Sequence, residues 1–113
     1  MYVCAGNDLH LNWEYITLLG ESVYVVEFTY SGITNELIGV STLGNFLTAP
    51  AYDKRVESTT NAGVTLKNVS SQDAGSYVVE IMWINQENCE HVERRVVNVV
   101  VASKNVIRNR ICN

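Results

Sequence analysis

The chain has 113 residues, the size of one compact domain, and is too short for two-lobed enzymes or for a (β/α)₈ barrel of about 250 residues. Hydrophobic residues make up 47% and charged residues 18%, a balance typical of a folded chain with an apolar core and not of a disordered one. The net charge of −4 gives no long-range attraction to nucleic acid or to an anionic membrane. The first residues lack a secretory-signal pattern, and no stretch is apolar enough for a membrane helix.

Short runs rich in Val, Ile, Tyr and Trp recur along the chain, separated by Gly, Asn and Ser turn chemistry. After a first strand near Cys4, the predicted strands are residues 12–18, 23–30, 37–42, 46–48, 55–58, 64–69, 77–84 and 92–101. No segment keeps apolar residues at helical spacing for three turns. The sequence therefore predicts an all-β sandwich or barrel.

Alternation within the last two predicted strands separates a core side from a solvent side. Two apolar sets are expected to face the core: Tyr77, Val79 and Ile81 in one strand, and Val97, Val99 and Val101 in the other. The opposite side of the first of these strands carries a charge and is the wetter one: Val78, Glu80 and Met82.

Residues 64–77, VTLKNVSSQDAGSY, join an alternating strand to a tight turn and a second strand. Asp73 can accept backbone and arginine hydrogen bonds at the turn, and Gly75 permits a backbone conformation that other residues avoid. The hydroxyl of Tyr77 can reach back to the turn backbone, in the arrangement called a tyrosine corner.

This L-x-x-V-x-x-x-D-x-G-x-Y string resembles the E–F corner of immunoglobulin V-set domains. Residues 20–25, GESVYV, resemble the A′–B turn and strand B of such domains, and Arg55 resembles the arginine that begins strand D. The resemblance implies a V-type β-sandwich in which an Arg55–Asp73 ion pair closes one end. It covers residues 19–101.

The sequence departs from the usual V-set pattern at the inter-sheet disulfide. Val79 stands where the strand F cysteine is usual, and neither Val26 nor Glu27 supplies the strand B cysteine. Residues 37–42, LIGVST, taken as strand C, lack the usual tryptophan. In lacking this disulfide, the chain resembles the distal domains of the SLAM and T-cell-adhesion receptor family, or a viral homologue of them. The core must then be held by apolar packing.

The three cysteines leave at least one thiol without an internal partner. In a V-type sandwich, Cys4 and Cys89 are expected at the same end, so the resemblance implies a Cys4–Cys89 disulfide; the alternative is three unpaired thiols. Cys112 is left over, in a C-terminal tail (104–113) that follows the domain (1–103). This leftover cysteine points to a longer exported protein.

Asn68-Val69-Ser70 is a glycosylation sequon in the predicted E–F loop, although a turn asparagine explains it equally well. No catalytic motif or phosphate-binding glycine loop is present, and Cys89-Glu90-His91 falls short of a metal site. We therefore expect no enzyme activity, no cofactor and no metal.

The resemblance implies partner recognition through the sheet of strands G, F, C and C′. The residues expected to point outward there are Val78, Glu80, Met82, Arg94 and Val96. We expect a non-catalytic adhesion module, at the cell surface or secreted, that binds an immune-receptor ectodomain or a second copy of itself. Two alternatives remain: a viral immune-evasion ligand or decoy, and a small β-barrel ligand carrier.

Overall fold

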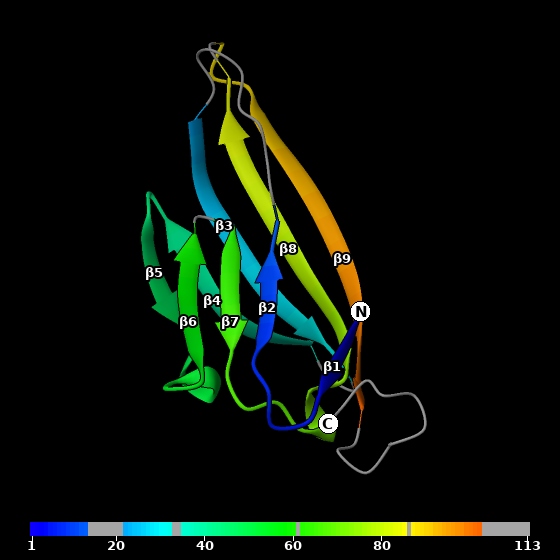
Figure 1. Cartoon of the computed structure of the whole chain (residues 1–113). Coiled ribbons are helices and arrows are strands. Elements are labelled where there is room, and N and C mark those ends of the chain that lie inside the picture. The colour runs from blue at the N-terminus through cyan, green and yellow to red at the C-terminus, as the bar shows by residue number, and fades with distance from the viewer. Residues whose placement is uncertain (14–21, 33–34, 61, 86, 103–113) are drawn as a thin grey trace.

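The computed structural model describes residues 1–13, 22–32, 35–60, 62–85 and 87–102, which form two facing β-sheets (Figure 1). The larger sheet has the order β1 (Tyr2–Cys4), β9 (Glu90–Ala102), β8 (Gly75–Ile84), β3 (Ser22–Ser31), β4 (Asn35–Thr42) and β5 (Asn45–Thr48). The smaller sheet has the order β2 (Leu9–Asn12), β7 (Gly63–Leu66) and β6 (Val56–Thr60). Neighbouring strands are antiparallel, except that β1 runs parallel to β9.

The space between the sheets is filled with apolar side chains, so the fold is the predicted β-sandwich. Among the described residues no strand pairing joins the two sheets, so the fold is a sandwich and not a closed barrel. Alternation predicted the core side of β8 and β9 correctly, because both predicted sets are buried or pack against the core. The buried core residues are Leu9, Leu11, Val26, Phe28, Ile38, Tyr52, Ala62, Val64, Leu66, Val69, Tyr77, Val79, Ile81 and Val99.

An aromatic cluster centred on Phe28 occupies the middle of the core. The centroid of the Phe28 ring lies 6.1 Å from the centroid of the Trp13 ring and 6.1 Å from that of the Phe46 ring. On the neighbouring strand, Phe28 lies opposite the fully buried Val79. Apolar and aromatic packing thus fills the region where the sequence lacks the usual strand F cysteine.

The predicted corner between β7 and β8 is present. The Tyr77 hydroxyl donates to the carbonyl oxygen of Asp73 at 2.6 Å, and two Arg55 nitrogens contact the Asp73 carboxylate at 2.9 and 3.3 Å. A 3₁₀ turn, η2 (Ser71–Asp73), is capped by Ser70, whose N–H donates to the Asp73 carboxylate. Burial raises the pKa of Tyr77, so its hydroxyl keeps its proton, and remains a donor, to a higher pH than an ordinary tyrosine does.

Gly75 satisfies two requirements of this corner. Its φ of +145° lies in a region that residues with a Cβ rarely adopt. A Cβ at this position would also lie 2.9 Å from the ring of Tyr30. The Tyr30 ring in turn packs 5.1 Å from that of Tyr77, and its hydroxyl donates to the Ala74 carbonyl oxygen.

The predicted Cys4–Cys89 disulfide is wrong. Cys4 lies opposite Ala102, the last residue of β9, whereas Cys89 directly precedes the first residue of that strand. A strand of this length spans about 40 Å, far beyond the ~7 Å limit between the Cα atoms of a disulfide. Cys4 is disulfide-bonded, but not to Cys89, whose exposed thiol is free. The predicted tail, with Cys112, lies outside the described residues.

Candidate binding face

The larger sheet has a solvent-facing surface on the side away from the smaller sheet, which we call the outer face. Side chains from β9, β8, β3, β4 and β5 form three rows across it. The row nearest the β8–β9 turn contains Val92, Met82, Val25 and Thr42. The middle row contains Arg94, Glu80, Glu27, Val40 and Leu47. The third row contains Val96, Val78, Thr29 and Leu37.

Apolar side chains are unusually exposed on this face. Val92 and Val96 on β9 are 57% and 53% exposed, and Leu37 on β4 is 45% exposed. At the far edge of the sheet, Leu47 on β5 is 74% exposed. These residues lie on β9 at one side of the outer face and on β4 and β5 at the other, with β8 and β3 between them.

The middle row carries the charges of the face. Glu27 lies directly opposite Glu80, and Glu80 lies opposite Arg94. Side chains that are directly opposite on antiparallel strands have Cβ atoms about 5 Å apart, and like charges in such pairs destabilise a sheet. Within the part of the chain that the structure describes, none of these three residues forms an ion pair.

The five outward residues predicted from the sequence all lie on this face, but they do not contribute equally. Arg94 and Val96 are exposed, while Glu80 and Met82 are half-buried. Val78, between Thr29 and Val96 in its row, is only 6% exposed. Val78 therefore supports the surface and offers little contact area of its own.

The β8–β9 turn forms one end of the molecule (Figure 1) and is organised by hydrogen bonds of Asn85. The Asn85 side-chain oxygen accepts from the N–H groups of Glu87 and Cys89. Its amide nitrogen contacts Nε2 of His91, whose ring stacks on Trp83.

The described residues contain no cluster of His, Cys, Asp and Glu that could hold a metal ion.

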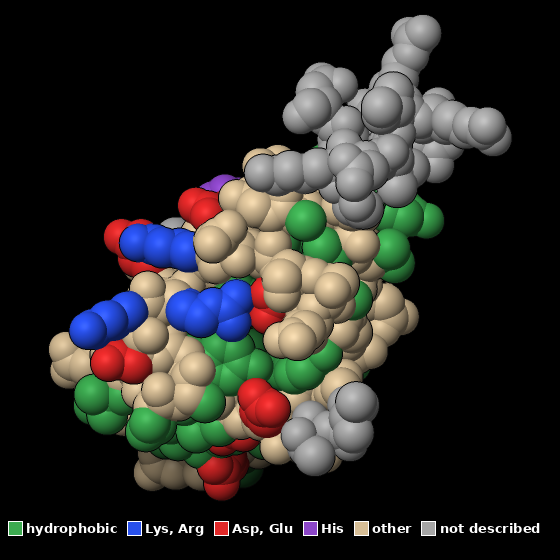
Figure 2. Space-filling view, turned by 90° about the horizontal axis from the view of Figure 1, so that it is seen from below, with side chains coloured by type: hydrophobic (Ala, Val, Ile, Leu, Met, Phe, Trp, Pro, Cys, Tyr) green, Lys and Arg blue, Asp and Glu red, His purple; other side chains and the backbone are tan. Residues whose placement is uncertain are grey.

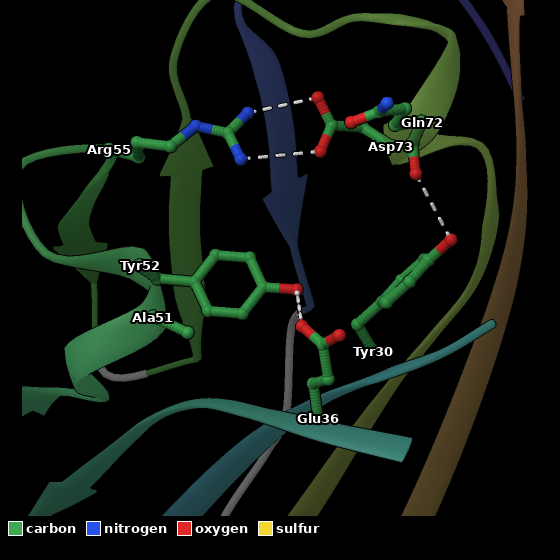
Figure 3. Close-up of a pocket in the computed structure, with 7 residues that line it drawn as sticks. All are labelled: Tyr30, Glu36, Ala51, Tyr52, Arg55, Gln72 and Asp73. Carbon is green, nitrogen blue, oxygen red and sulfur yellow. Dashed lines mark hydrogen bonds and ion pairs between the residues drawn. The ribbon is translucent and has the colours of Figure 1, made fainter. Parts of the chain in front are cut away.

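A hollow of about 510 Å³ lies at the opposite end, beside the Arg55–Asp73 ion pair (Figure 3). Figure 2 shows this end, where acidic and basic side chains lie around apolar ones. The polar groups that line the hollow bond to the protein itself: Tyr52 donates to Glu36 at 3.1 Å, and Tyr30 to the backbone. Burial raises the pKa of Tyr52, and the nearby carboxylate of Glu36 raises it further. We assign this hollow a structural role.

Asn68 is exposed at the end of β7, with a left-handed φ of +51°. Its backbone N–H donates to the Asp8 carboxylate at 3.0 Å. Since β7 belongs to the smaller sheet, the sequon does not lie among the outer-face rows. A glycan on Asn68 would leave those rows accessible.

No family model and no curated protein sequence matches the chain. Among solved structures, murine CRIg is similar with a TM-score of 0.81 at 13% identity, over 90% of this chain and 91% of that one. The V domain of amphioxus IgVJ-C2 has a TM-score of 0.71 at 15% identity, over 89% and 98%. The first Ig-like domain of human CD48 antigen has a TM-score of 0.69 at 13% identity, over 91% and 80%.

This chain has the immunoglobulin V-type fold. In that fold, strands C′ and C″ extend the sheet of strands G, F and C, while strands B, E and D lie in the other sheet. The order of the larger sheet therefore makes β9 strand G, β8 strand F, β3 strand C, β4 strand C′ and β5 strand C″. In the smaller sheet, β2, β7 and β6 are strands B, E and D.

This topology corrects the predicted strand letters. The strand that begins at Ser22 was predicted as strand B, but it lies between β8 and β4 and is strand C. Consequently Val26 and Glu27 were never strand B positions, and LIGVST belongs to strand C′. Strand B is the short Leu9–Asn12 segment, and Phe28 is the large aromatic residue of strand C. Residues 14–21, which include most of the predicted strand 12–18 and the predicted A′–B turn at Gly20, lie outside the described residues.

The same error hid part of the candidate site. With β3 taken as strand B, Glu27 was not expected beside Glu80. The alternation of Leu9 and Leu11 with polar residues was a usable signal for strand B. Had it been used, the next strand would have been placed in the other sheet.

The described residues contain no helix long and apolar enough to cross a membrane.

Proposed function

We propose that this domain is a non-catalytic recognition module, displayed at a cell surface or secreted, that binds another protein ectodomain through its outer face. The observation that carries the proposal is the gathering of exposed apolar side chains on that face around a charged row. A face that mixes exposed apolar side chains with polar and charged ones is typical of protein interaction sites. A face of mixed apolar and charged groups suits a weak contact whose specificity depends on charge.

The comparisons support the class of this function. The similar structures include an Ig-like domain of human CD48 antigen and the β subunits of voltage-gated sodium channels, which are described by their cell-adhesive interactions. One of these β subunits is described as a parallel homodimer that acts in cell–cell adhesion. At 13–15% identity these likenesses concern the fold, so the partner of this chain has to be found by experiment.

Serine substitutions on the outer face test the proposal. The wild-type domain is first screened by surface plasmon resonance against a panel of immune-cell ectodomains. Leu37→Ser and Val96→Ser remove exposed apolar area without changing charge, and each should weaken the Kd of a partner about five- to tenfold. Glu57→Ser, on β6 of the smaller sheet, is the matched control and should bind as the wild type does. Equal binding by all four proteins, or no binding to any panel member, would contradict the proposal.

We also propose that Asn68 carries an N-linked glycan when the chain passes through the secretory pathway. Its support is the exposed sequon at the end of β7. Asn68→Gly should abolish a mass shift that an N-glycosidase removes from the wild type. Glycine tolerates the left-handed backbone of this position, so the folded domain should be retained. A secreted wild-type protein with the unmodified mass would rule the glycan out.

A further inference from the structure

The outer face holds two glutamates directly opposite each other on neighbouring strands, and the same row offers one basic residue, Arg94, for the two of them. Glu27 and Glu80 are directly opposite on β3 and β8, and both side chains are half-buried. Arg94 lies on the far side of Glu80, and no ion pair joins it to either carboxylate. Such a pair destabilises the isolated sheet, and partial burial strengthens the repulsion because less water screens it.

The rows on either side of this pair are largely apolar. Met82 and Val25 lie on the side toward the β8–β9 turn, and Val78 and Thr29 lie on the other. A docked surface that covered these rows would exclude water from the two carboxylates as well. Buried charges that lack a partner are costly, so the partner must supply positive charge at this point.

We propose that the partner of this domain presents an arginine or lysine side chain between Glu27 and Glu80, surrounded by apolar side chains. The proposal rests on the proposed function and names the chemistry of the same site. A guanidinium or ammonium there would contact both carboxylates and replace their repulsion by two charge-assisted hydrogen bonds. The geometry thus fits a partner whose contact surface is basic and apolar.

The charges favour such a partner over a second copy of this chain. The middle row carries two acidic groups and one basic group, and the whole chain has a net charge of −4. Two copies that met face to face would therefore bring together surfaces with an excess of negative charge. Long-range repulsion between the copies would also slow their encounter.

The first test needs no partner. Glu27→Gln and Glu80→Gln keep the side-chain shape and remove one charge each, so the melting temperature of each variant should equal or exceed that of the wild type. Glu57→Gln is the matched control, because Glu57 is ion-paired with Lys67 at 3.3 Å on the other sheet. A fall in the melting temperature of both outer-face variants would mean that the carboxylates are already satisfied within the domain, which overturns the proposal.

The second test uses two blocked peptides, acetyl-Val-Arg-Val-amide and acetyl-Val-Glu-Val-amide, titrated into ¹⁵N-labelled protein. The arginine peptide should shift the amide signals of Glu27 and Glu80, and the glutamate peptide should not. The double variant Glu27→Gln/Glu80→Gln should lose the response. Equal shifts with both peptides, or none with the arginine peptide, would overturn the proposal.

The third test uses the panel member that binds the wild type. The double glutamine variant should bind it about tenfold more weakly, and added salt should weaken binding of the wild type much more than that of the double variant. If Leu37→Ser and Val96→Ser weaken binding but the double variant does not, the outer face is the site and the basic partner is excluded. Dimerisation of the wild type in sedimentation experiments, abolished by Val96→Ser, would identify a second copy as the occupant and also overturn the proposal.

Discussion

Replacing Phe28 with alanine should lower the free energy of unfolding by about 4 kcal/mol. Phe28 is 1% exposed and lies on β3, the strand that pairs with both β8 and β4. Its ring contacts those of Trp13 and Phe46, and each aromatic pair adds about 0.5–1.5 kcal/mol beyond the buried area. Truncation would remove both ring contacts and leave a cavity in the centre of the sandwich.

The residue directly opposite Phe28 on β4 has no side chain that could fill that cavity. Gly39 lies opposite Phe28 on β4, and the Phe46 ring occupies the space where a Cβ of Gly39 would be. The described part of the core contains no cysteine, so no inter-sheet disulfide limits the unfolded chain there. Domains of this size are stable by only about 5–15 kcal/mol, and the alanine variant should therefore be much less stable.

Chemical denaturation followed by tryptophan fluorescence measures this effect. Phe28→Leu retains most of the side-chain volume and should cost about 1.5 kcal/mol, so it stays folded if the alanine variant does not. Leu47→Ala, on the exposed edge strand, is the control and should change stability by less than about 0.5 kcal/mol. A loss below about 1.5 kcal/mol for Phe28→Ala would show that Phe28 is not central to the core.

The features that the sequence predicted correctly depend on residues close together in the chain. The corner needs Asp73, Gly75 and Tyr77, whose backbone and side-chain roles follow from local geometry. The faces of β8 and β9 follow from the period-two alternation of a strand. The Arg55–Asp73 ion pair is the exception: its residues are 18 positions apart, and it was predicted from the V-set resemblance and not from local geometry.

The features that were missed depend on which strands are neighbours. The alternation in β3 tells which side of the strand is buried, but it does not tell which sheet contains the strand. The parallel pairing of β1 with β9 is equally invisible in the sequence, yet it places Cys4 opposite Ala102. The Glu27–Glu80 pair exists only because residues 53 positions apart share a register, which no local pattern reports.

Replacing Asp73 with alanine should lower the free energy of unfolding by about 3 kcal/mol. The Asp73 carboxylate accepts two hydrogen bonds from Arg55 and one, at 2.8 Å, from the N–H of Ser70. Its loss would leave the half-buried Arg55 without this ion-pair partner and remove the Asp73 half of the capping box of η2, the acceptor of the Ser70 N–H. Because that turn directs the chain from β7 into β8, the damage would extend to the strand that supports the outer face.

Arginine and aspartate should contribute unequally to this corner. Arg55→Ala should cost only about 1 kcal/mol, because its side chain is 39% exposed and solvent screens the ion pair. In that variant Asp73 still accepts from Ser70, so the turn keeps its cap. The double variant should lose less than the sum of the two single losses, because the two residues interact directly.

Urea denaturation of the three variants and the wild type gives this coupling as a double-mutant cycle. The control is Glu57→Ala, which removes an exposed ion pair with Lys67 and should cost less than about 0.5 kcal/mol. If Arg55→Ala costs as much as Asp73→Ala, the ion pair and not the cap of η2 holds the corner. Strand β8 would then be positioned by a contact between the two sheets, and weakening that contact should also weaken partner binding at the outer face.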